Sequence, residues 1–184
     1  ETTQYRCEWH TWLVDLLDSK KITVHEMFRT AALADSFINL HPGVAAGANA
    51  ESARYLFPSC LGIAMKFEGN KKIFLFRNVL RLVCNYTEHG MLLETKLRLV
   101  ELLVLKSLDF KVARSTVLSS FLDCIAEQGL DVDAMVASTN TVSAVRFLHV
   151  TKNIMFSAEA MDDDLRRTAT KHAASEYVAF LGIT

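Results

Sequence analysis

Apolar residues along this chain recur at the spacing of helices rather than strands. Over residues 3–19, 24–40, 72–86 and 92–108 they stand three and four positions apart, and another apolar segment ends near Phe67. The sequence holds only seven glycines and two prolines, and β-branched residues rarely alternate with polar ones. The pattern therefore predicts an all-α protein.

Start and stop signals set the limits of these helices. Thr23 and Glu26 have the spacing of a capping box in front of the helix over 24–40, and the His-Pro-Gly sequence at 41–43 ends it. Pro58 lies inside the next apolar segment. Because an interior proline breaks the hydrogen-bond ladder, a helix either begins at Pro58 or kinks there.

A second domain is expected after a break in this periodicity. Residues 109–115 mix polar and apolar side chains without a helical period, which predicts a linker. Further helices are expected beyond the linker over residues 116–126, within 133–156 and from Asp162 onward. The predicted domains are therefore residues 1–114 and residues 115–184, the second being the smaller.

The helix over 92–108 is apolar on most of its surface. Leucines and valines cover nearly its whole circumference at about 100° per residue. These are Leu97, Leu99, Val100, Leu102, Leu103, Val104 and Leu108. Glu94, Arg98 and Glu101, joined by Leu105, form its narrow polar stripe. We therefore expect this helix at the centre of a bundle, with Glu101 either solvated or bound to a partner.

Lys66 is a second charged residue in an otherwise apolar helix. It lies in the last turn of the segment that ends near Phe67. One interpretation of the polar stripe is a set of surface ion pairs among Glu94, Arg98 and Glu101, worth roughly a few tenths of a kcal/mol each. The other interpretation assigns Lys66 and Glu101 to the binding of another macromolecule.

Arg6 and Asp35 each lie on an apolar helix face. Arg6 falls among the aromatic and aliphatic residues of 5–17, and Asp35 falls among those of the helix over 24–40. A charge on such a face is costly unless it is paired. We therefore predict an Arg6–Asp35 salt bridge, and loss of either partner should cost about 3–5 kcal/mol because the other charge stays buried.

Composition argues against several classes of function. The formal net charge of −1 provides no basic stripe for a phosphate backbone, so direct binding of nucleic acid is not expected. The four cysteines are far apart and inside apolar segments, which is typical of a reduced compartment. The chain reaches no apolar run of about 18–20 residues, so no membrane contact is expected. It opens with Glu-Thr-Thr-Gln, so we expect an intracellular piece of a longer protein.

The residues also give no pattern of catalysis. The six histidines are scattered, none of them lies beside a serine or cysteine in a nucleophile arrangement, and no glycine-rich phosphate loop occurs. Three consecutive acids at 162–164 point in different directions on a helix, and a helix N-terminus favours acids in any case. We therefore expect no enzyme activity, no metal and no cofactor.

Four segments, in this order, resemble the motifs of the cyclin box. Tyr5-Arg6-Cys-Glu-Trp9-His-Thr-Trp12-Leu13 is similar to Met-Arg-x-x-Leu-x-x-Trp-Leu, and Leu33-Ala-Asp35-Ser-Phe37-Ile38 is similar to a segment with Asp-Arg-Phe-Leu. Ala64-Met-Lys66-Phe67-Glu68 is similar to Ala-Ser-Lys-Phe/Tyr-Glu. Glu101-x-x-x-Leu105-x-x-Leu108-x-Phe110 is similar to Glu-x-x-x-Leu-x-x-Leu-x-Phe/Trp. The resemblance implies a five-helix bundle around a central apolar helix, in which Arg6 and Asp35 form the family's buried pair.

The resemblance also implies a function. A cyclin has no catalytic activity of its own, but it binds a cyclin-dependent protein kinase and positions the regulatory helix of that enzyme, in cell-cycle or transcriptional control. Carried over by position, Lys66 and Glu101 would hydrogen-bond the kinase main chain. The apolar contacts to the kinase would come from Phe67, Leu105, Phe110 and Val112.

The substrate-docking patch of the family, which receives Arg-x-Leu peptides of substrates or inhibitors, corresponds here to Tyr5, Glu8, Trp9, Trp12, Asp15 and Arg54. Trp12 matches the family pattern, whereas Trp9 replaces a leucine, Asp15 a glutamate and Arg54 a glutamine. Arg54 would repel the peptide arginine or pair with Asp15. The alternative interpretation makes Trp9 and Trp12 packing aromatics of the bundle.

Residues 115–184 show no clear motif match after Phe121. About 70 residues are too few for a full second box, so a shortened or degenerate second cyclin box is expected there. The rival to a kinase activator is a cyclin-fold transcription adaptor or scaffold that binds other proteins without a kinase. The resemblance implies a location in the nucleus, the cytoplasm or both.

Overall fold

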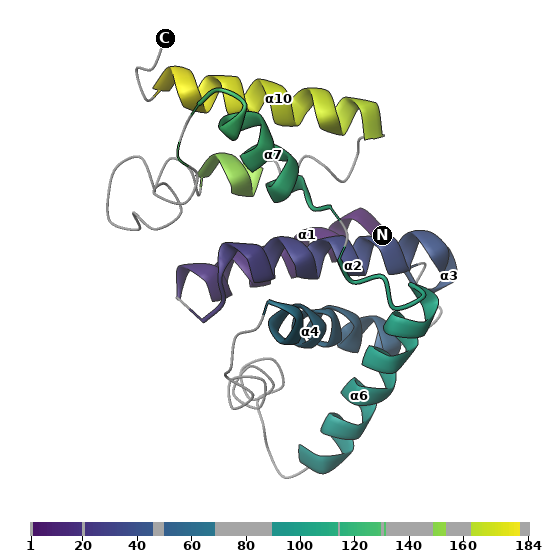
Figure 1. Ribbon diagram of the computed structural model, residues 1–184. Coiled ribbons are helices and arrows are strands. Elements are labelled where there is room, and N and C mark those ends of the chain that lie inside the picture. The colour runs from purple at the N-terminus through teal and green to yellow at the C-terminus, as the bar shows by residue number, and fades with distance from the viewer. Residues whose placement is uncertain are drawn as a thin grey trace. The chain divides into compact units, whose positions relative to one another are not determined.

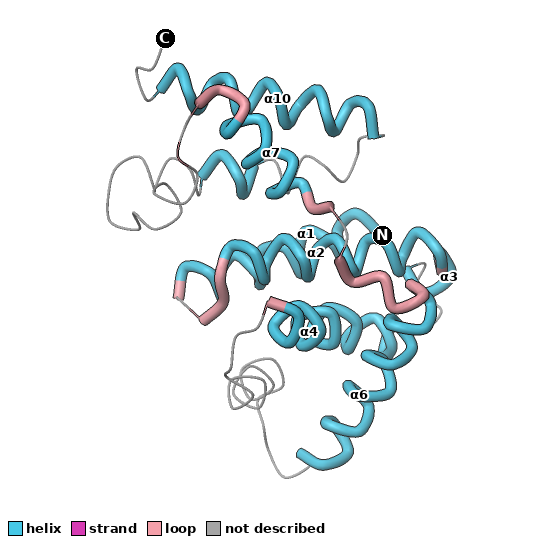
Figure 2. The backbone as a smooth tube through the Cα atoms, in the orientation of Figure 1, coloured by secondary structure: helices cyan, strands magenta, loops and turns pink. Residues whose placement is uncertain are grey.

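The computed structural model describes residues 2–19, 21–45, 50–68, 90–113, 115–129, 131, 149–153 and 163–180 (Figure 1). In these ranges every regular element is a helix and none is a strand (Figure 2). The prediction of an all-α protein is therefore confirmed for the described part of the chain. Among the helices of this part, none is long and apolar enough to cross a membrane. The chain divides into two compact units, Glu1–Arg114 and Ser115–Thr184.

The first unit contains helices that follow the sequence pattern closely. They are α1 (Thr2–Asp18), α2 (Val24–Leu40), α3 (Pro42–Ala45), α4 (Ala50–Phe67) and α6 (Gly90–Ser107). The predicted helix over 72–86 lies outside the described residues. At 41–43, where the sequence predicts a stop, α2 ends and the short α3 begins directly with Pro42, a residue favoured at a first helical position.

The capping box predicted for α2 is present. The backbone N–H of Glu26 donates to Thr23 Oγ1 at 3.2 Å, and the backbone N–H of Thr23 donates to Glu26 Oε2 at 2.7 Å. Two helix N-terminal donors are thereby satisfied at once, although the Glu26 side chain is buried. The local sequence thus fixes where α2 begins, and with it the position of every side chain along the helix.

Helix α4 forms the core of the first unit. Every residue from 56 to 65 is buried, and α4 packs against α2, α3 and α6 (Figure 1). The helix runs without a break through Pro58, so the alternative that it begins at this proline is wrong. Small residues such as Ser59, Gly62 and Ala64 allow neighbouring helices to approach α4 closely.

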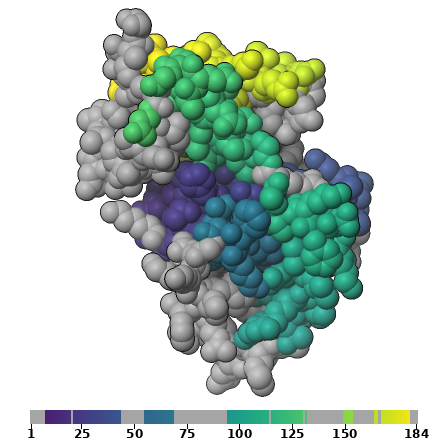
Figure 3. Space-filling model, in the orientation of Figure 1, coloured from purple at the N-terminus to yellow at the C-terminus, as the bar shows by residue number. Residues whose placement is uncertain are grey.

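The expectation that the helix over 92–108 is the central one is wrong. Among the described side chains of α6, Leu97 and Val104 are buried, as is Leu108 directly after the helix, whereas Leu99, Leu102 and Leu103 are exposed. In the space-filling view α6 (teal) lies at the surface beside α4 (blue) (Figure 3). The two helices are joined by a buried hydrogen bond, in which Ser59 Oγ donates to the Leu97 carbonyl at 3.0 Å. The leucines on most faces of α6 therefore do not mean that all of these faces are buried.

The predicted Arg6–Asp35 ion pair stays a prediction, because the Arg6 side chain lies outside the described residues. Asp35 is partly buried on α2, and α1 packs against α2. Its carboxylate also influences the thiol of Cys60 in the core of α4. Burial, with a smaller contribution from the charge of Asp35, raises the pKa of this thiol far above its ordinary value.

The second unit contains α7 (Val117–Ala126) and α10 (Asp163–Phe180), with residues 149–153 also helical. Helix α7 begins at Thr116, whose side chain accepts a hydrogen bond from the Ser119 backbone, as expected for a helix start at this point. Helices α7 and α10 pack against each other. Buried Phe121 and Tyr177 meet in this interface with ring centroids 6.2 Å apart.

Candidate functional site

Lys66 and Glu101 form an ion pair between α4 and α6. Lys66 stands in the last turn of α4 and Glu101 in the middle of α6, and the ammonium Nζ donates to Glu101 Oε1 at 2.5 Å. The Lys66 side chain is 58% exposed and the Glu101 side chain 13% exposed. The two charges that the sequence analysis singled out separately therefore lie together at the protein surface.

This pair contributes little to folding. An ion pair with one largely exposed partner is worth about 0–1 kcal/mol, because water and salt screen it. Glu94 and Arg98, the other charges of the predicted polar stripe, pair with each other along α6 at 2.7 Å.

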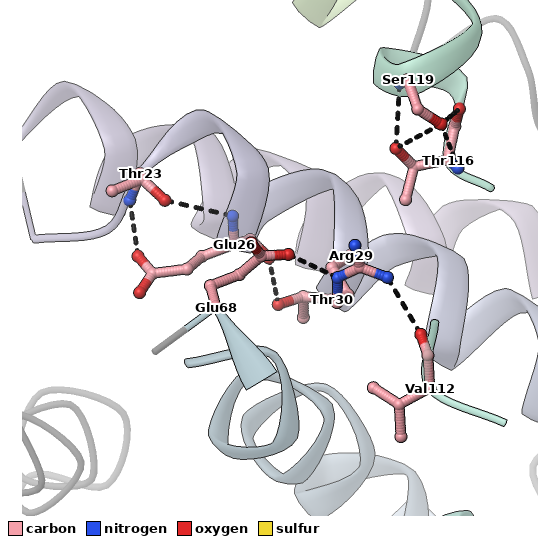
Figure 4. A network of polar contacts seen from close by, with 8 residues as sticks. All are labelled: Thr23, Glu26, Arg29, Thr30, Glu68, Val112, Thr116 and Ser119. Atoms are coloured by element: carbon pink, nitrogen blue, oxygen red, sulfur yellow. Dashed lines mark hydrogen bonds and ion pairs between the residues drawn. The ribbon is translucent and has the colours of Figure 1, made fainter. Parts of the chain in front are cut away.

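Phe67 and Glu68 continue the chain from Lys66 and contact α2 instead of α6. The guanidinium carbon of Arg29 in α2 lies 4.4 Å from the Phe67 ring centroid, in a cation–π arrangement, while 46% of Phe67 stays exposed. Arg29 Nε donates to Glu68 Oε1 at 2.5 Å (Figure 4). Three consecutive residues at the end of α4, Lys66, Phe67 and Glu68, thus connect this end of the helix to α6 and to α2.

Arg29 also reaches the segment that follows α6. Its Nη1 donates to the carbonyl oxygen of Val112 at 2.9 Å (Figure 4). No signal in the sequence marks Arg29, because a single arginine at the flank of an amphipathic helix is an ordinary solvated residue. Its partners are 39 and 83 positions away in the sequence, and no local pattern indicates such contacts.

The end of α6 presents Phe110 to solvent. Phe110 N–H donates to the Leu105 carbonyl at 2.8 Å and Asp109 N–H to the Lys106 carbonyl at 3.1 Å, which is the bonding of a Schellman motif. Asp109 and Phe110 have φ values of 52° and 56°, the left-handed region that favours glycine. Phe110 is 61% exposed. A strained turn therefore holds an aromatic side chain outward.

The residues assigned to kinase binding all lie in the described part of the first unit. Lys66 contacts Glu101 directly, and Arg29 connects Phe67 with the Val112 backbone. Leu105 is partly buried on α6, and its carbonyl accepts the hydrogen bond that shapes the Phe110 turn. We call this set, Lys66, Phe67, Glu101, Leu105, Phe110 and Val112, the candidate binding surface.

The residues of the predicted docking patch are only partly described. On α1, Glu8 and Asp15 are exposed, whereas Trp9 and Trp12 are partly buried and meet edge to face with ring centroids 5.1 Å apart. Trp9 also stacks on Phe57 of α4, with centroids 5.3 Å apart and rings within 2° of parallel. Trp9 thus packs against the core helix. The side chains of Tyr5 and Arg54 lie outside the described residues, and the docking role of the patch stays a prediction.

The candidate binding surface has the character of a protein contact. It combines exposed aromatic rings, which are enriched at protein interfaces, with one ion pair, whose Lys and Glu side chains are more typical of the ordinary protein surface. Within the described ranges, potential metal-ligating side chains do not gather in groups of three or more. Among known proteins, no family model, no curated protein and no solved structure matches this chain.

Proposed function

We propose that this chain is a cyclin, a non-catalytic regulatory subunit that binds and activates a cyclin-dependent protein kinase. The observation that supports the proposal best is the contact between Lys66 and Glu101. The sequence motifs assign both residues to one partner, and the two side chains meet at 2.5 Å on the surface, with Phe67 beside Lys66 in the chain. Had the two charges lain on opposite sides of the unit, they could not serve one binding site.

The proposed mechanism follows from what kinases require. Phosphoryl transfer needs the ion pair between a strand lysine and the glutamate of the kinase regulatory helix, together with the metal-binding aspartate in place. A protein that binds only the inward position of that helix shifts the kinase toward its active state. Here the Lys66 ammonium would donate to main-chain carbonyls next to the kinase helix, and the Glu101 carboxylate would accept from main-chain N–H groups.

The hydrogen bonds proposed for Lys66 and Glu101 are large enough for this task, provided that they form only with the inward position of the kinase helix. Moving a two-state equilibrium from 1:99 to 99:1 takes a difference of about 5.5 kcal/mol in binding to the two states. Hydrogen bonds to charged groups contribute about 1.5–3 kcal/mol each, so two of them, from Lys66 and Glu101, supply roughly 3–6 kcal/mol. Burial of the Phe67 and Phe110 rings would add to the affinity.

A double variant tests the proposal. Lys66→Ala with Glu101→Ala should stay folded, because the pair is largely a surface contact, yet should activate a cyclin-dependent kinase at least about tenfold less, the effect of losing roughly 1.4 kcal/mol. Glu94→Ala with Arg98→Ala is the matched control, because it removes an ion pair from the same helix and should leave activation unchanged. Full activation by a folded Lys66/Glu101 double variant would exclude this binding site.

The rival function, a cyclin-fold transcription adaptor or scaffold, gives a different result in a simple binding experiment. The protein is mixed with purified cyclin-dependent kinase subunits and, separately, with promoter DNA carrying basal initiation factors, and each mixture is separated by size. Comigration with a kinase supports the activator. Comigration with the promoter complex alone would favour the adaptor.

A further inference from the structure

The guanidinium of Arg29 contacts two segments of the candidate binding surface at the same time. Its Nε pairs with Glu68, directly after α4, and its Nη1 bonds the carbonyl of Val112, after α6 (Figure 4). The group also covers one face of the Phe67 ring at 4.4 Å. The Arg29 side chain is only 16% exposed and that of Glu68 25% exposed, so the guanidinium itself is largely shielded from water.

The geometry of an arginine makes this arrangement rigid. The nitrogens of a guanidinium lie in one plane at fixed separations, so two acceptors bonded to different nitrogens are held at a fixed distance from each other. Lysine carries a single nitrogen on a flexible stem and cannot fix two acceptors in this way. The Glu68 carboxylate and the Val112 carbonyl are therefore held in register by one planar group.

The segment around Val112 depends on such an external contact. It follows the left-handed turn at Asp109 and Phe110 and lies outside any helix, so helical hydrogen bonds do not hold it. The Val112 N–H bonds the Phe110 carbonyl at 3.0 Å, which couples the two residues locally. The bond from Arg29 to Val112 connects this turn to α2.

We propose that Arg29 is a positioning residue, which sets the distance between Phe67 at the end of α4 and the Phe110–Val112 turn after α6. The inference rests on the proposed function, because both of these segments belong to the candidate binding surface. Arg29 acts through its neighbours and contributes no contact of its own to the kinase. Its fixed geometry allows the two apolar contacts to meet the same partner simultaneously.

Two variants of the contact separate geometry from charge. Arg29→Lys keeps the positive charge but loses the planar group, whereas Glu68→Gln keeps an acceptor for Arg29 Nε but loses the negative charge. Thr23→Ala is the stability control, because it removes the cap of the same helix without altering any contact of Arg29. Each protein is measured for thermal stability, for affinity toward a panel of purified cyclin-dependent kinase subunits, and for amide hydrogen exchange over residues 108–113.

If Arg29 positions the surface, Arg29→Lys weakens kinase affinity by about tenfold, because loss of the intramolecular bond to Val112 lowers the population of the binding-competent turn by about that factor. The same variant speeds exchange at residues 108–113. Glu68→Gln loses less affinity than Arg29→Lys, and Thr23→Ala lowers thermal stability without a comparable loss of binding. Two results would overturn the assignment of Arg29 while leaving the proposed function intact. One is wild-type kinase affinity of the Arg29→Lys variant, and the other is a loss of affinity that merely follows the loss of thermal stability across all three variants. Absence of binding by the wild-type protein to every kinase overturns the proposed function and this inference with it.

Discussion

Replacement of Asp109 by glycine should stabilise the first unit. Asp109 is the left-handed residue at the end of α6, with φ 52°. An L-residue in this conformation costs about 1–2 kcal/mol, and an aspartate somewhat less, whereas glycine adopts it freely. The change also removes a carboxylate from the negative end of the α6 dipole, a gain of about 0.3–1 kcal/mol.

Two losses oppose this gain. Asp109 pairs with Lys111 at 3.1 Å, but both side chains are largely exposed, so the pair is worth about 0–1 kcal/mol. Glycine also has more conformational freedom in the unfolded chain, which costs about 0.5–1 kcal/mol. The balance leaves Asp109→Gly more stable than wild type by about 1 kcal/mol.

Urea unfolding followed by tryptophan fluorescence measures this change. Both tryptophans of the chain, Trp9 and Trp12, lie in α1, so the signal reports the unit that contains Asp109. With a slope of about 1–3 kcal/mol per molar urea, the midpoint should rise by about 0.3–1 M. Asp109→Ala is the control, because alanine removes the charge but keeps the strain. Equal stability of the glycine and alanine variants would show that the left-handed turn is not adopted in solution.

The remaining predictions concern buried groups. Ser59→Ala should lower the free energy of unfolding by about 1 kcal/mol in the same fluorescence assay, because it removes the buried bond to the Leu97 carbonyl. Burial raises the pKa of Cys60, so its thiol should resist alkylation at neutral pH while the less buried Cys124 reacts. Peptide mass spectrometry measures the labelling of each cysteine, and equal labelling of the two would contradict the packing of α4. Burial also raises the pKa of Tyr177 above its ordinary value, so its contribution to stability is complete below that ordinary value and is lost as the pH rises further. Tyr177→Phe should therefore reduce the alkaline loss of stability seen by circular dichroism, and identical pH profiles would contradict this.

Local signals in the sequence were sufficient to place several helices, although they did not predict the short α3 or the start of α4. The bounds of α2 were predictable because Thr23 and Glu26 mark its start chemically, and the structure contains both bonds of that capping box. The start of α7 at Thr116 follows from the same chemistry. Local propensity and capping act within a few residues, so a single sequence carries the information they need.

The packing of the helices against one another was harder to predict from the sequence. The leucines of α6 suggested a central helix, but the small residues of α4 around Ser59 make α4 the helix that its neighbours surround. Lys66 and Glu101 stood out as charges on apolar helices, yet their mutual contact depends on how α4 and α6 cross. Arg29 gave no signal at all, because its role arises from residues that only the fold brings together. Periodicity identifies the faces of a helix but does not say which face meets which neighbour.

The contacts at the end of α4 constrain how the sequence of this protein can evolve. Lys66 depends on Glu101, and the next two residues depend on Arg29, so substitutions at these positions are not independent. In homologous chains Lys66 and Glu101 should be retained together, because reversal of both charges would exchange the donor and the acceptor proposed to bind the kinase main chain. Arg29 should be retained together with Glu68, because only a donor at position 29 can bond the Val112 carbonyl. Independent drift at the four positions would show that selection does not maintain these contacts.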